Sequence, residues 1–187
     1  MKALTGINKK LFSHLNIDEE DPAWEKFTKF EFSKKKIFSN NKVYFVEEGL
    51  VRKFYIKEIA DMDQEISADF YFPGEVFVVG EDTKEKPSEV FFESINKGFA
   101  WEIGLDEVKD MFAVNPECRF VQNYFLSRKL NAAMKREMLL LKNTPQDLYK
   151  YLLKNKSHYI KHIPLKYLAS YIGITPISLS RIRKRIN

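Results

Sequence analysis

The feature that most constrains this chain is a pair of short helix patterns near its C-terminal end. Residues 165–171 predict a first helix, in which Leu168 and Ile172 lie four residues apart on one face. The small Ala169 lies beside them, at the point where a second helix has to approach closely. We therefore expect two helices that cross at short range.

The residues between these two helix patterns specify a sharp turn. Gly173 stands where the chain must reverse direction, and glycine accepts the positive φ that such a turn requires. Thr175 offers a hydroxyl that can cap a second helix, and Pro176 suits its first position. The spacing is typical of a helix-turn-helix motif.

The second helix of this motif predicts one apolar and one basic face. Leu179, Ile182 and Ile186 recur at helical spacing and can pack on the first helix. The side chains that then point elsewhere are Ile177, Ser178, Arg181, Arg183, Lys184 and Arg185. Residues 144–187 contain nine Lys or Arg and one acid, a net charge of +8, which leaves −3 for residues 1–143. A segment this basic attracts nucleic-acid phosphates.

Composition indicates a globular protein without a membrane partner. The 187 residues are 44% apolar and 14% aromatic, enough for one large or two small cores. The single cysteine, Cys118, excludes an internal disulfide and cannot ligate a zinc ion or iron-sulfur cluster alone. No apolar run approaches the roughly 20 residues of a membrane span, so we expect a cytoplasmic location.

The middle of the chain has the composition of β-strands. Short runs rich in β-branched and aromatic residues are separated by Gly49, by the acidic residues 61–65, by Pro73-Gly74 and by other turn residues. The runs span residues 24–32, 43–46, 50–56, 66–72, 76–79, 90–95 and 99–103. About seven short strands predict a β-roll or sandwich.

Helical periodicity begins after Asp106, and Pro116 marks the expected start of a long helix. Its apolar residues recur at spacings of three and four, namely Leu126, Leu130, Ala133, Met134, Met138 and Leu141. Such a stripe could pack on the β-roll, but about 25 helical residues span roughly 37 Å, which is longer than a small domain needs. Dimerisation through this stripe is the favoured interpretation.

The order of parts resembles that of the Crp/Fnr family, the cyclic-nucleotide-receptor and fumarate-nitrate-reduction type transcription regulators. The residues that carry the resemblance are 46–52 (VEEGLVR), 72–75 (FPGE), 173–176 (GITP), Ser180 and Arg181. The resemblance implies an α+β fold with an N-terminal double-stranded β-roll like a cyclic-nucleotide-binding domain, a dimerisation helix and a C-terminal helix-turn-helix. It also implies double-stranded DNA as the partner.

The resemblance assigns roles in DNA binding to individual residues. Arg181 takes the position of an arginine that reads a guanine edge or clamps a phosphate, and Ser178 one that contacts backbone or base. Ile177 departs from the family, which commonly has glutamate there, and can offer only apolar contact. The expected phosphate contacts are Thr175, Ser180, Arg183, Lys184, Arg185 and Lys166.

The effector site departs further from the family pattern. Gly80-Glu81 matches the Gly-Glu pair of the phosphate-binding cassette, but Pro87-Ser88-Glu89 stands where an Arg-Ser-Ala or Arg-Thr-Ala triplet is expected. Without the arginine, a buried cyclic phosphate lacks its charge-assisted partner. We expect that cyclic AMP is not bound and keep Gly80, Glu81 and Ser88 as candidate effector-pocket residues; the effector, if one exists, is unidentified.

An enzymatic function has no support in the sequence. His14, His158 and His162 all fall outside the expected strands, so they cannot hold a catalytic metal inside a β-roll. No phosphate loop or nucleophile elbow is present. We predict neither catalytic residues nor a metal or cofactor.

The sequence therefore predicts a homodimeric, sequence-specific DNA-binding transcription regulator. Residues 1–115 are expected to form the β-roll sensor domain, residues 116–143 the dimerisation helix, and residues 144–187 the DNA-binding domain. RNA polymerase is a candidate further partner. The alternative is a small-molecule-binding β-roll module whose basic tail contacts a protein or RNA partner.

Overall fold

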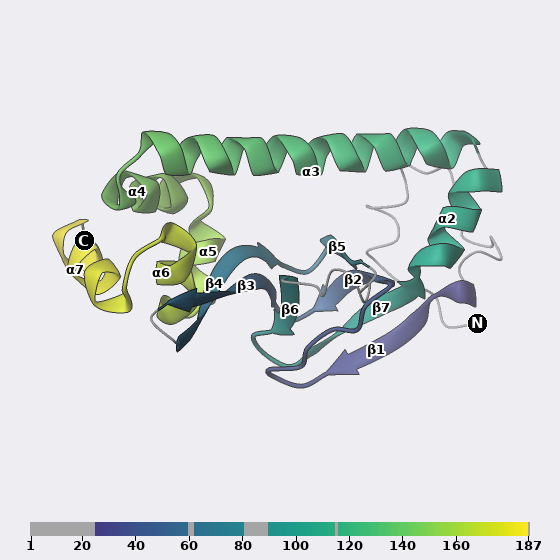
Figure 1. The fold of residues 1–187 in the computed structure, drawn as a ribbon, viewed down its shortest axis with the longest axis horizontal. Helices are drawn as coiled ribbons and strands as arrows, with labels where there is room; N and C mark the ends of the chain where they lie inside the picture. The colour runs from purple at the N-terminus through teal and green to yellow at the C-terminus, as the bar shows by residue number, and fades with distance from the viewer. Residues whose placement is uncertain (1–24, 60–61, 81–89, 115, 187) are drawn as a thin grey trace. The chain divides into compact units, whose positions relative to one another are not determined.

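The computed structural model describes residues 25–59, 62–80, 90–114 and 116–186 (Figure 1). The chain divides into two compact units. The first unit contains the described residues up to Lys53 together with Phe70–Leu126. The second contains the described residues of Phe54–Asp69 and of Ser127–Asn187. Residues 54–69 of the β-rich part therefore group with the C-terminal helices.

An antiparallel four-stranded sheet forms one layer of the first unit. Its order is β1, β7, β2, β5, so β7 pairs with two strands that are distant in sequence. The register between β2 and β7 shifts between Val46 and Glu48, which marks a bulge. The bounds of these strands are Thr28–Phe32 (β1), Lys42–Glu48 (β2), Val76–Val79 (β5) and Gly98–Gly104 (β7).

A three-stranded sheet has the order β4, β3, β6. Its strands are Val51–Ile59 (β3), Met62–Tyr71 (β4) and Val90–Ser94 (β6). The acidic residues 61–65, which the sequence predicts as a separating turn, instead contribute Asp63 and Glu65 to β4. Both residues are exposed, so a charged side chain on the solvent side of a strand is compatible with the sheet.

Gly49 makes the turn from β2 to β3 possible. Its φ of +103° lies in the region that only glycine adopts readily. Beside it, a Cβ on Gly98 would collide with the carbonyl of Glu48, so the two glycines allow the backbones to approach. The Leu50 amide then donates to Asn96 Oδ1 at 2.7 Å. This geometry explains why the glycine in residues 46–52 is followed at once by a strand.

Aromatic side chains fill the core of the first unit. The ring of Phe77 stacks on Tyr44 at 5.1 Å and on Phe92 at 4.9 Å, with interplanar angles of 19° and 12°. Phe38 meets both Tyr44 and Phe77 edge-on. Tyr44, Phe77 and Phe92 are each no more than 5% exposed. Stacked and edge-on rings of this kind add to the stability that burial alone supplies.

Two helices follow the last strand. Helix α2 (Leu105–Val114) begins directly after β7, and the carboxylate of Glu107 in its first turn accepts from the Gly104 amide at 2.9 Å. Helix α3 (Pro116–Lys142) begins at the proline that the sequence predicts as its start. Among the described residues, no helix is long and apolar enough to cross a membrane.

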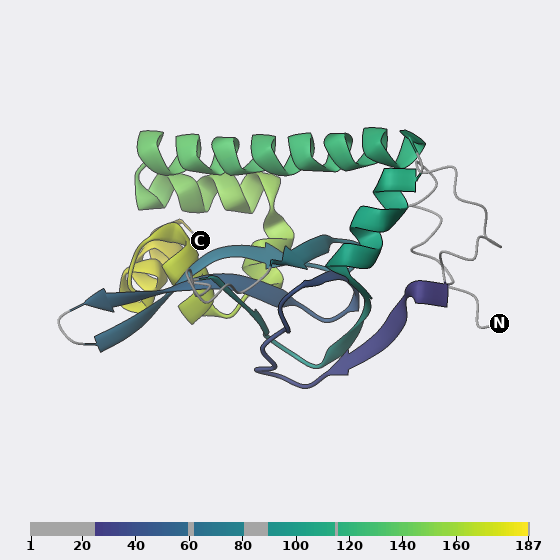
Figure 2. The same ribbon diagram turned by 45° about the vertical axis from the view of Figure 1, so that its right-hand side comes forward.

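The second unit is dominated by helices: the part of α3 from Ser127, then α4 (Pro145–Asn155), α5 (Ser157–His162), α6 (Leu165–Ile172) and α7 (Pro176–Ile186). Figure 2 shows α4 alongside the C-terminal part of α3. Thr144 caps α4 by accepting from the Asp147 amide, and Pro145 occupies its first turn. These two residues confirm the predicted helix start.

The short helix α5 is absent from the sequence-based prediction. It has only six residues and no side-chain cap, so neither periodicity nor an N-terminal signal marks it. Its one buried residue, Tyr159, packs near Tyr171 with the ring centroids 5.8 Å apart. Tertiary packing therefore stabilises α5 rather than local propensity.

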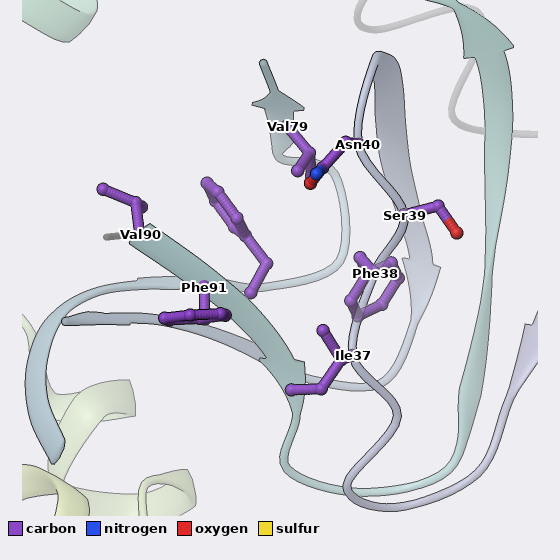
Figure 3. A pocket seen from close by; sticks show the side chains of 8 residues that line it. Ile37, Phe38, Ser39, Asn40, Val79, Val90 and Phe91 are labelled. Carbon is purple, nitrogen blue, oxygen red and sulfur yellow. The ribbon is translucent and has the colours of Figure 1, made fainter. Parts of the chain in front are cut away.

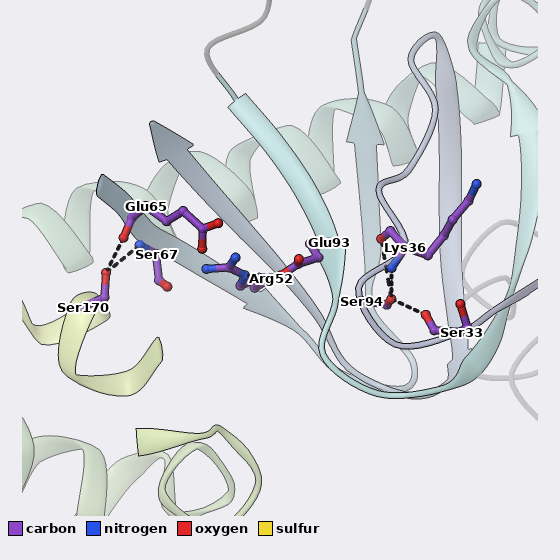
Figure 4. Close-up of polar contacts among 8 residues, drawn as sticks. All are labelled: Ser33, Lys36, Arg52, Glu65, Ser67, Glu93, Ser94 and Ser170. Atoms are coloured by element: carbon purple, nitrogen blue, oxygen red, sulfur yellow. Dashed lines mark hydrogen bonds and ion pairs between the residues drawn. The ribbon is translucent and has the colours of Figure 1, made fainter. Parts of the chain in front are cut away.

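The part of β4 that belongs to the second unit is hydrogen-bonded to α6. The Ser67 amide donates to Ser170 Oγ at 2.9 Å, and Ser170 Oγ donates to the carbonyl of Glu65 at 3.2 Å (Figure 4). One hydroxyl thus satisfies two backbone groups of β4, which explains why residues 54–69 cluster with the helices.

Candidate nucleic-acid interface

The turn between α6 and α7 has the geometry that the sequence predicts. Gly173 adopts a left-handed φ of +85°. Its amide donates to the Ser170 carbonyl, and the Ile174 amide donates to the Ala169 carbonyl, both at 3.0 Å. This pair of bonds is a Schellman motif, which satisfies the last carbonyls of α6. Ala169 is fully buried, as expected where two helices meet closely.

Thr175 caps the start of α7. Its Oγ1 accepts from the Ser178 amide at 3.2 Å and lies 3.0 Å from Ser178 Oγ. Pro176 occupies the first helical position. Both hydroxyls therefore orient each other at the N-terminus of α7, where the helix dipole favours an anion.

Helix α7 buries one face and exposes a basic one. Leu179 is fully buried, and Ile182 and Ile186 are half-buried on the same side. Ile177 is 67% exposed, which leaves an apolar side chain open to solvent near the start of the helix. The remaining candidate residues are either exposed (Thr175, Arg181, Lys184, Arg185, and Lys166 on α6) or half-buried (Ser178, Ser180, Arg183).

The apolar stripe on α3 is exposed within this chain. Leu141 is 80% exposed, Leu130 61% and Leu126 60%. Met134 is 57% and Met138 43% exposed, and Ala133 is exposed as well. Large apolar side chains that recur along one helix face with this exposure usually mark an interface.

The candidate effector residues are only partly described. Gly80 accepts from the Asn41 amide at 3.1 Å through its carbonyl, whereas Glu81 and Ser88 lie outside the described residues. Nearby, a cavity of about 310 Å³ opens between the residues before β2 and strand β6 (Figure 3). Ile37, Phe38, Val79, Val90 and Phe91 give this cavity mainly apolar walls, with Ser39 and Asn40 beside them.

A buried ion pair in the first unit is invisible in the sequence. Arg52 Nε donates to Glu93 Oε2 at 2.7 Å, and the Arg52 side chain is only 1% exposed (Figure 4). The two residues come from the neighbouring strands β3 and β6. Next to Glu93, Ser94 Oγ donates to the Ser33 carbonyl at 2.6 Å and accepts from the Lys36 amide at 2.9 Å. These contacts have a structural role in the first unit rather than a catalytic one.

Two tyrosines have raised pKa values because they are buried. Burial, assisted by the Glu102 carboxylate, raises the pKa of Tyr44 to about 12. Burial also raises the pKa of Tyr171, and the Asp69 carboxylate raises it further, while the guanidinium of Arg136 lowers it. Both phenols therefore stay neutral at physiological pH. No group of three His, Cys, Asp or Glu side chains in the described part of the chain could hold a metal ion.

Comparison with solved structures identifies the fold. No protein-family model and no curated protein sequence matches this chain. FixK2 from Bradyrhizobium japonicum is 18% identical over 86% of this chain and 84% of its own, with a TM-score of 0.69. A cyclic nucleotide-binding domain containing protein from Listeria monocytogenes is 13% identical over 97% and 90%, with a TM-score of 0.68.

A transcriptional regulator described as a Crp/Fnr family member, from Eubacterium rectale, is 16% identical over 97% of this chain and 83% of its own, with a TM-score of 0.63. These identities are low, so the likeness establishes fold. The chain has the fold of Crp/Fnr-type transcription regulators, which confirms at that level the resemblance carried by residues 46–52, 72–75 and 173–176.

Proposed function

We propose that this protein is a homodimeric, sequence-specific DNA-binding transcription regulator without enzymatic activity. The observation that carries the proposal is the exposed basic face of α7, which follows a Schellman turn and a threonine cap. A capped helix that buries Leu179 and exposes arginines can enter a major groove while α6 supports it from behind. The fold shared with known regulators supports the same function.

The individual DNA contacts are proposed from the positions of the residues on α7, at its N-cap and on α6. Arg181, exposed one turn after the helix start, is proposed to read a base edge, because its guanidinium can bond a guanine at two points. Ser178 and Ile177 tune the choice of base, the latter through apolar contact with a thymine methyl. Phosphates are proposed to be held by Thr175, Ser180, Arg183, Lys184, Arg185 and Lys166.

The exposed stripe on α3 is proposed to form the homodimer. Two copies packed along Leu126, Leu130, Ala133, Met134, Met138 and Leu141 would bury apolar surface that one chain leaves in water. A two-fold dimer presents two α7 helices to DNA, so its operator should be palindromic, with half-sites about one helical turn apart. Residues 116–143 would thus be the dimerisation helix and residues 144–187 the DNA-binding domain.

Residues 1–115 are proposed to form a sensor or scaffold domain that does not bind cyclic AMP. Among the described residues, the stacked rings of Tyr44, Phe77 and Phe92 fill the interior of the roll with mainly apolar surface, and the sequence has Pro87 where the family's phosphate-binding arginine is expected. Gly80, Glu81 and Ser88 remain candidate effector residues, and RNA polymerase remains a candidate partner. Micromolar affinity for cyclic AMP in a titration would contradict this part of the proposal.

One observation favours the alternative of a small-molecule-binding module. The cavity of about 310 Å³ beside β6 has the size and apolar lining of a small-ligand site. If ligand binding is the main activity, the basic C-terminal helices would contact a protein or an RNA. The two functions differ in whether the protein prefers one duplex sequence over others.

The test is selection from a pool of randomised DNA duplexes by the purified protein at physiological salt. We expect enrichment of a two-fold-symmetric motif. Arg181→Ala should lose about 1 to 3 kcal/mol of binding free energy and relax the preference at one position per half-site. Lys184→Ala should weaken all sequences equally and reduce the salt dependence of binding.

Lys161→Ala is the matched control, because Lys161 is an exposed lysine of the same basic region but lies on α5. This variant should retain the wild-type motif. If the wild-type protein enriches no motif, sequence-specific DNA recognition is contradicted. The ligand-binding module, with the cavity beside β6 as its site, then becomes the better-supported function.

A further inference from the structure

The second unit contains a cavity that the DNA-binding proposal does not use. Its volume is about 150 Å³, and it lies where α3, α4 and α6 meet. Leu148 and Leu152 of α4 and Tyr171 of α6, all no more than 6% exposed, form buried walls, and Leu139 and Leu140 of α3 add further apolar surface. An apolar cavity of this size is large enough for a molecule of about the size of benzene.

Cations surround this apolar space. Among the described residues that line it, Lys135, Arg136 and Lys156 are basic and none is acidic. Lys135 Nζ lies 5.9 Å from the Tyr151 ring centre, and Lys156 Nζ lies 4.4 Å from the ring centre of Tyr159. One carboxylate, Asp69, acts on the Tyr171 phenol from outside the lining, so the three cations exceed the nearby negative charge. This balance around a small apolar cavity favours an anion that also carries an apolar body.

Arg136 lines the cavity and has one donor without a hydrogen-bond partner among the described residues. Its guanidinium lies 4.5 Å from the centre of the Tyr171 ring, and one Nη donates to the Tyr171 carbonyl at 3.4 Å. Its Nε is buried and, among the described residues, has no hydrogen-bond partner. Leaving a buried charged donor unpaired costs stability, and a ligand carboxylate would supply the missing acceptor.

The cavity and the proposed dimer interface lie on different sides of α3. Ala132, Arg136 and Leu139 line the cavity at spacings of four and three. The exposed stripe contains Leu130 and Met134, each two residues earlier, which corresponds to a rotation of about 200° around the helix. A second copy packed on the stripe would therefore leave Ala132, Arg136 and Leu139 uncovered, while Leu140, which also lines the cavity, lies at the edge of the stripe beside Leu141.

We propose that this cavity binds a small monocarboxylate with an apolar body of about benzene size. The carboxylate bonds Arg136 and is attracted by Lys135 and Lys156, while the apolar body lies against Leu148, Leu152 and Tyr171. A bound molecule contacts α3, α4 and α6 together, so it holds these helices of the second unit in one arrangement. The ligand site does not depend on DNA binding; any effect of the ligand on DNA affinity rests on the proposed function.

Benzoate is the probe, measured by isothermal titration on the full chain. Benzamide, which has the same shape without the charge, and acetate, which has the charge without the ring, are the comparison ligands. We expect benzoate to bind at least about tenfold more tightly than either, because a charge-assisted bond and burial of the ring both contribute. Equal affinity for benzamide, or no detectable binding of benzoate, would overturn the proposal.

Three variants locate the site. Arg136→Gln should weaken benzoate binding by about tenfold or more. Ala132→Phe keeps every charge but adds a ring at a residue that lines the cavity, and it should abolish binding. Lys142→Gln, which removes an exposed cation of α3 outside the cavity, should bind as the wild type does. Benzoate affinity that survives both Arg136→Gln and Ala132→Phe would mean that the ligand binds elsewhere.

The duplex selection separates this proposal from the proposed function. Benzoate binding at the cavity by a protein that selects no DNA motif would contradict the regulator and leave the ligand site standing. A selected motif without benzoate binding would contradict the ligand site and leave the proposed regulator standing. If both hold, the affinity for the selected duplex should change when benzoate is present, by the same factor that DNA changes the affinity for benzoate.

Discussion

The interior of the β-roll and the interior of the helical unit are built from different side chains. In the roll, aromatic rings stack face to face around Phe77, and strands β3 and β6 carry the buried charged pair Arg52–Glu93. In the helical unit, aliphatic residues such as Leu152, Leu168 and Leu179 are fully buried, and cations lie over tyrosine rings at the margin.

The two regions also differ in how far apart in sequence the residues lie whose contacts specify them. The ring stack joins Tyr44, Phe77 and Phe92, which are far apart in sequence, so the roll depends on long-range pairing. The α6–α7 pair depends on Gly173 and Thr175, whose bonds reach no more than five residues along the chain. We therefore expect substitutions in the roll to cost more stability than substitutions in the turn.

The largest effect is expected for Phe77→Ala. Removing a ring that is 2% exposed and stacked on two others should lower the free energy of unfolding of the roll by about 4 kcal/mol. The measurement is urea unfolding followed by the fluorescence of Trp101 in β7, in a Trp24→Phe background. Val78→Ala on the same strand is the control, because Val78 is 47% exposed and should change stability by less than about 0.5 kcal/mol. Equal losses of unfolding free energy in the two variants would show that burial and stacking of the Phe77 ring add nothing to the stability of the roll.

A somewhat smaller loss is expected for Arg52→Met. This change leaves the Glu93 carboxylate without its 2.7 Å partner in a largely buried position, which should cost about 3 kcal/mol in the same unfolding experiment. The double variant Arg52→Met/Glu93→Leu removes both charges and should recover most of that loss, because a buried ion pair and an apolar pair of similar volume are close in free energy. A double variant as unstable as the single one would argue that Arg52 acts through its other contacts.

The smallest effect is expected for Gly173→Ala, at about 1 kcal/mol in the helical unit, measured by far-ultraviolet circular dichroism during urea unfolding. A Cβ at Gly173 would meet no atom within 4 Å, so the whole cost comes from its left-handed φ of +85°. Gly80→Ala, in the first unit, is the comparison, because a Cβ there also meets no atom of the described residues within 4 Å but its φ lies outside the left-handed region. If both variants lose the same stability, the left-handed conformation is not the cause.

Much of the fold could be predicted because the relevant signals are local. The strand runs predict every strand of the two sheets to within a few residues, and Pro116, Thr144 and Pro145 mark helix starts that the structure confirms. Errors arose where a local signal was ambiguous: the acidic residues 61–65 look like a turn but partly belong to β4, and α5 is too short to show a period. The stripe on α3 could likewise be read from spacing, but only its exposure shows that this chain leaves it uncovered.

The amino-acid sequence by itself determined the strand runs, the helix starts at Pro116 and Pro145, the turn at Gly173, the cap at Thr175 and the basic face of α7, but not the short helix α5. Each of these depends on residues within about one turn of one another, where backbone sterics and capping act directly. The tertiary structure alone decided which distant residues meet. It paired Arg52 with Glu93 across 41 residues, joined Ser67 to Ser170 across 103, and brought α3, α4 and α6 around one cationic cavity. Such contacts arise only when the whole chain has packed, because no periodicity or local motif encodes which partner a buried polar group will find.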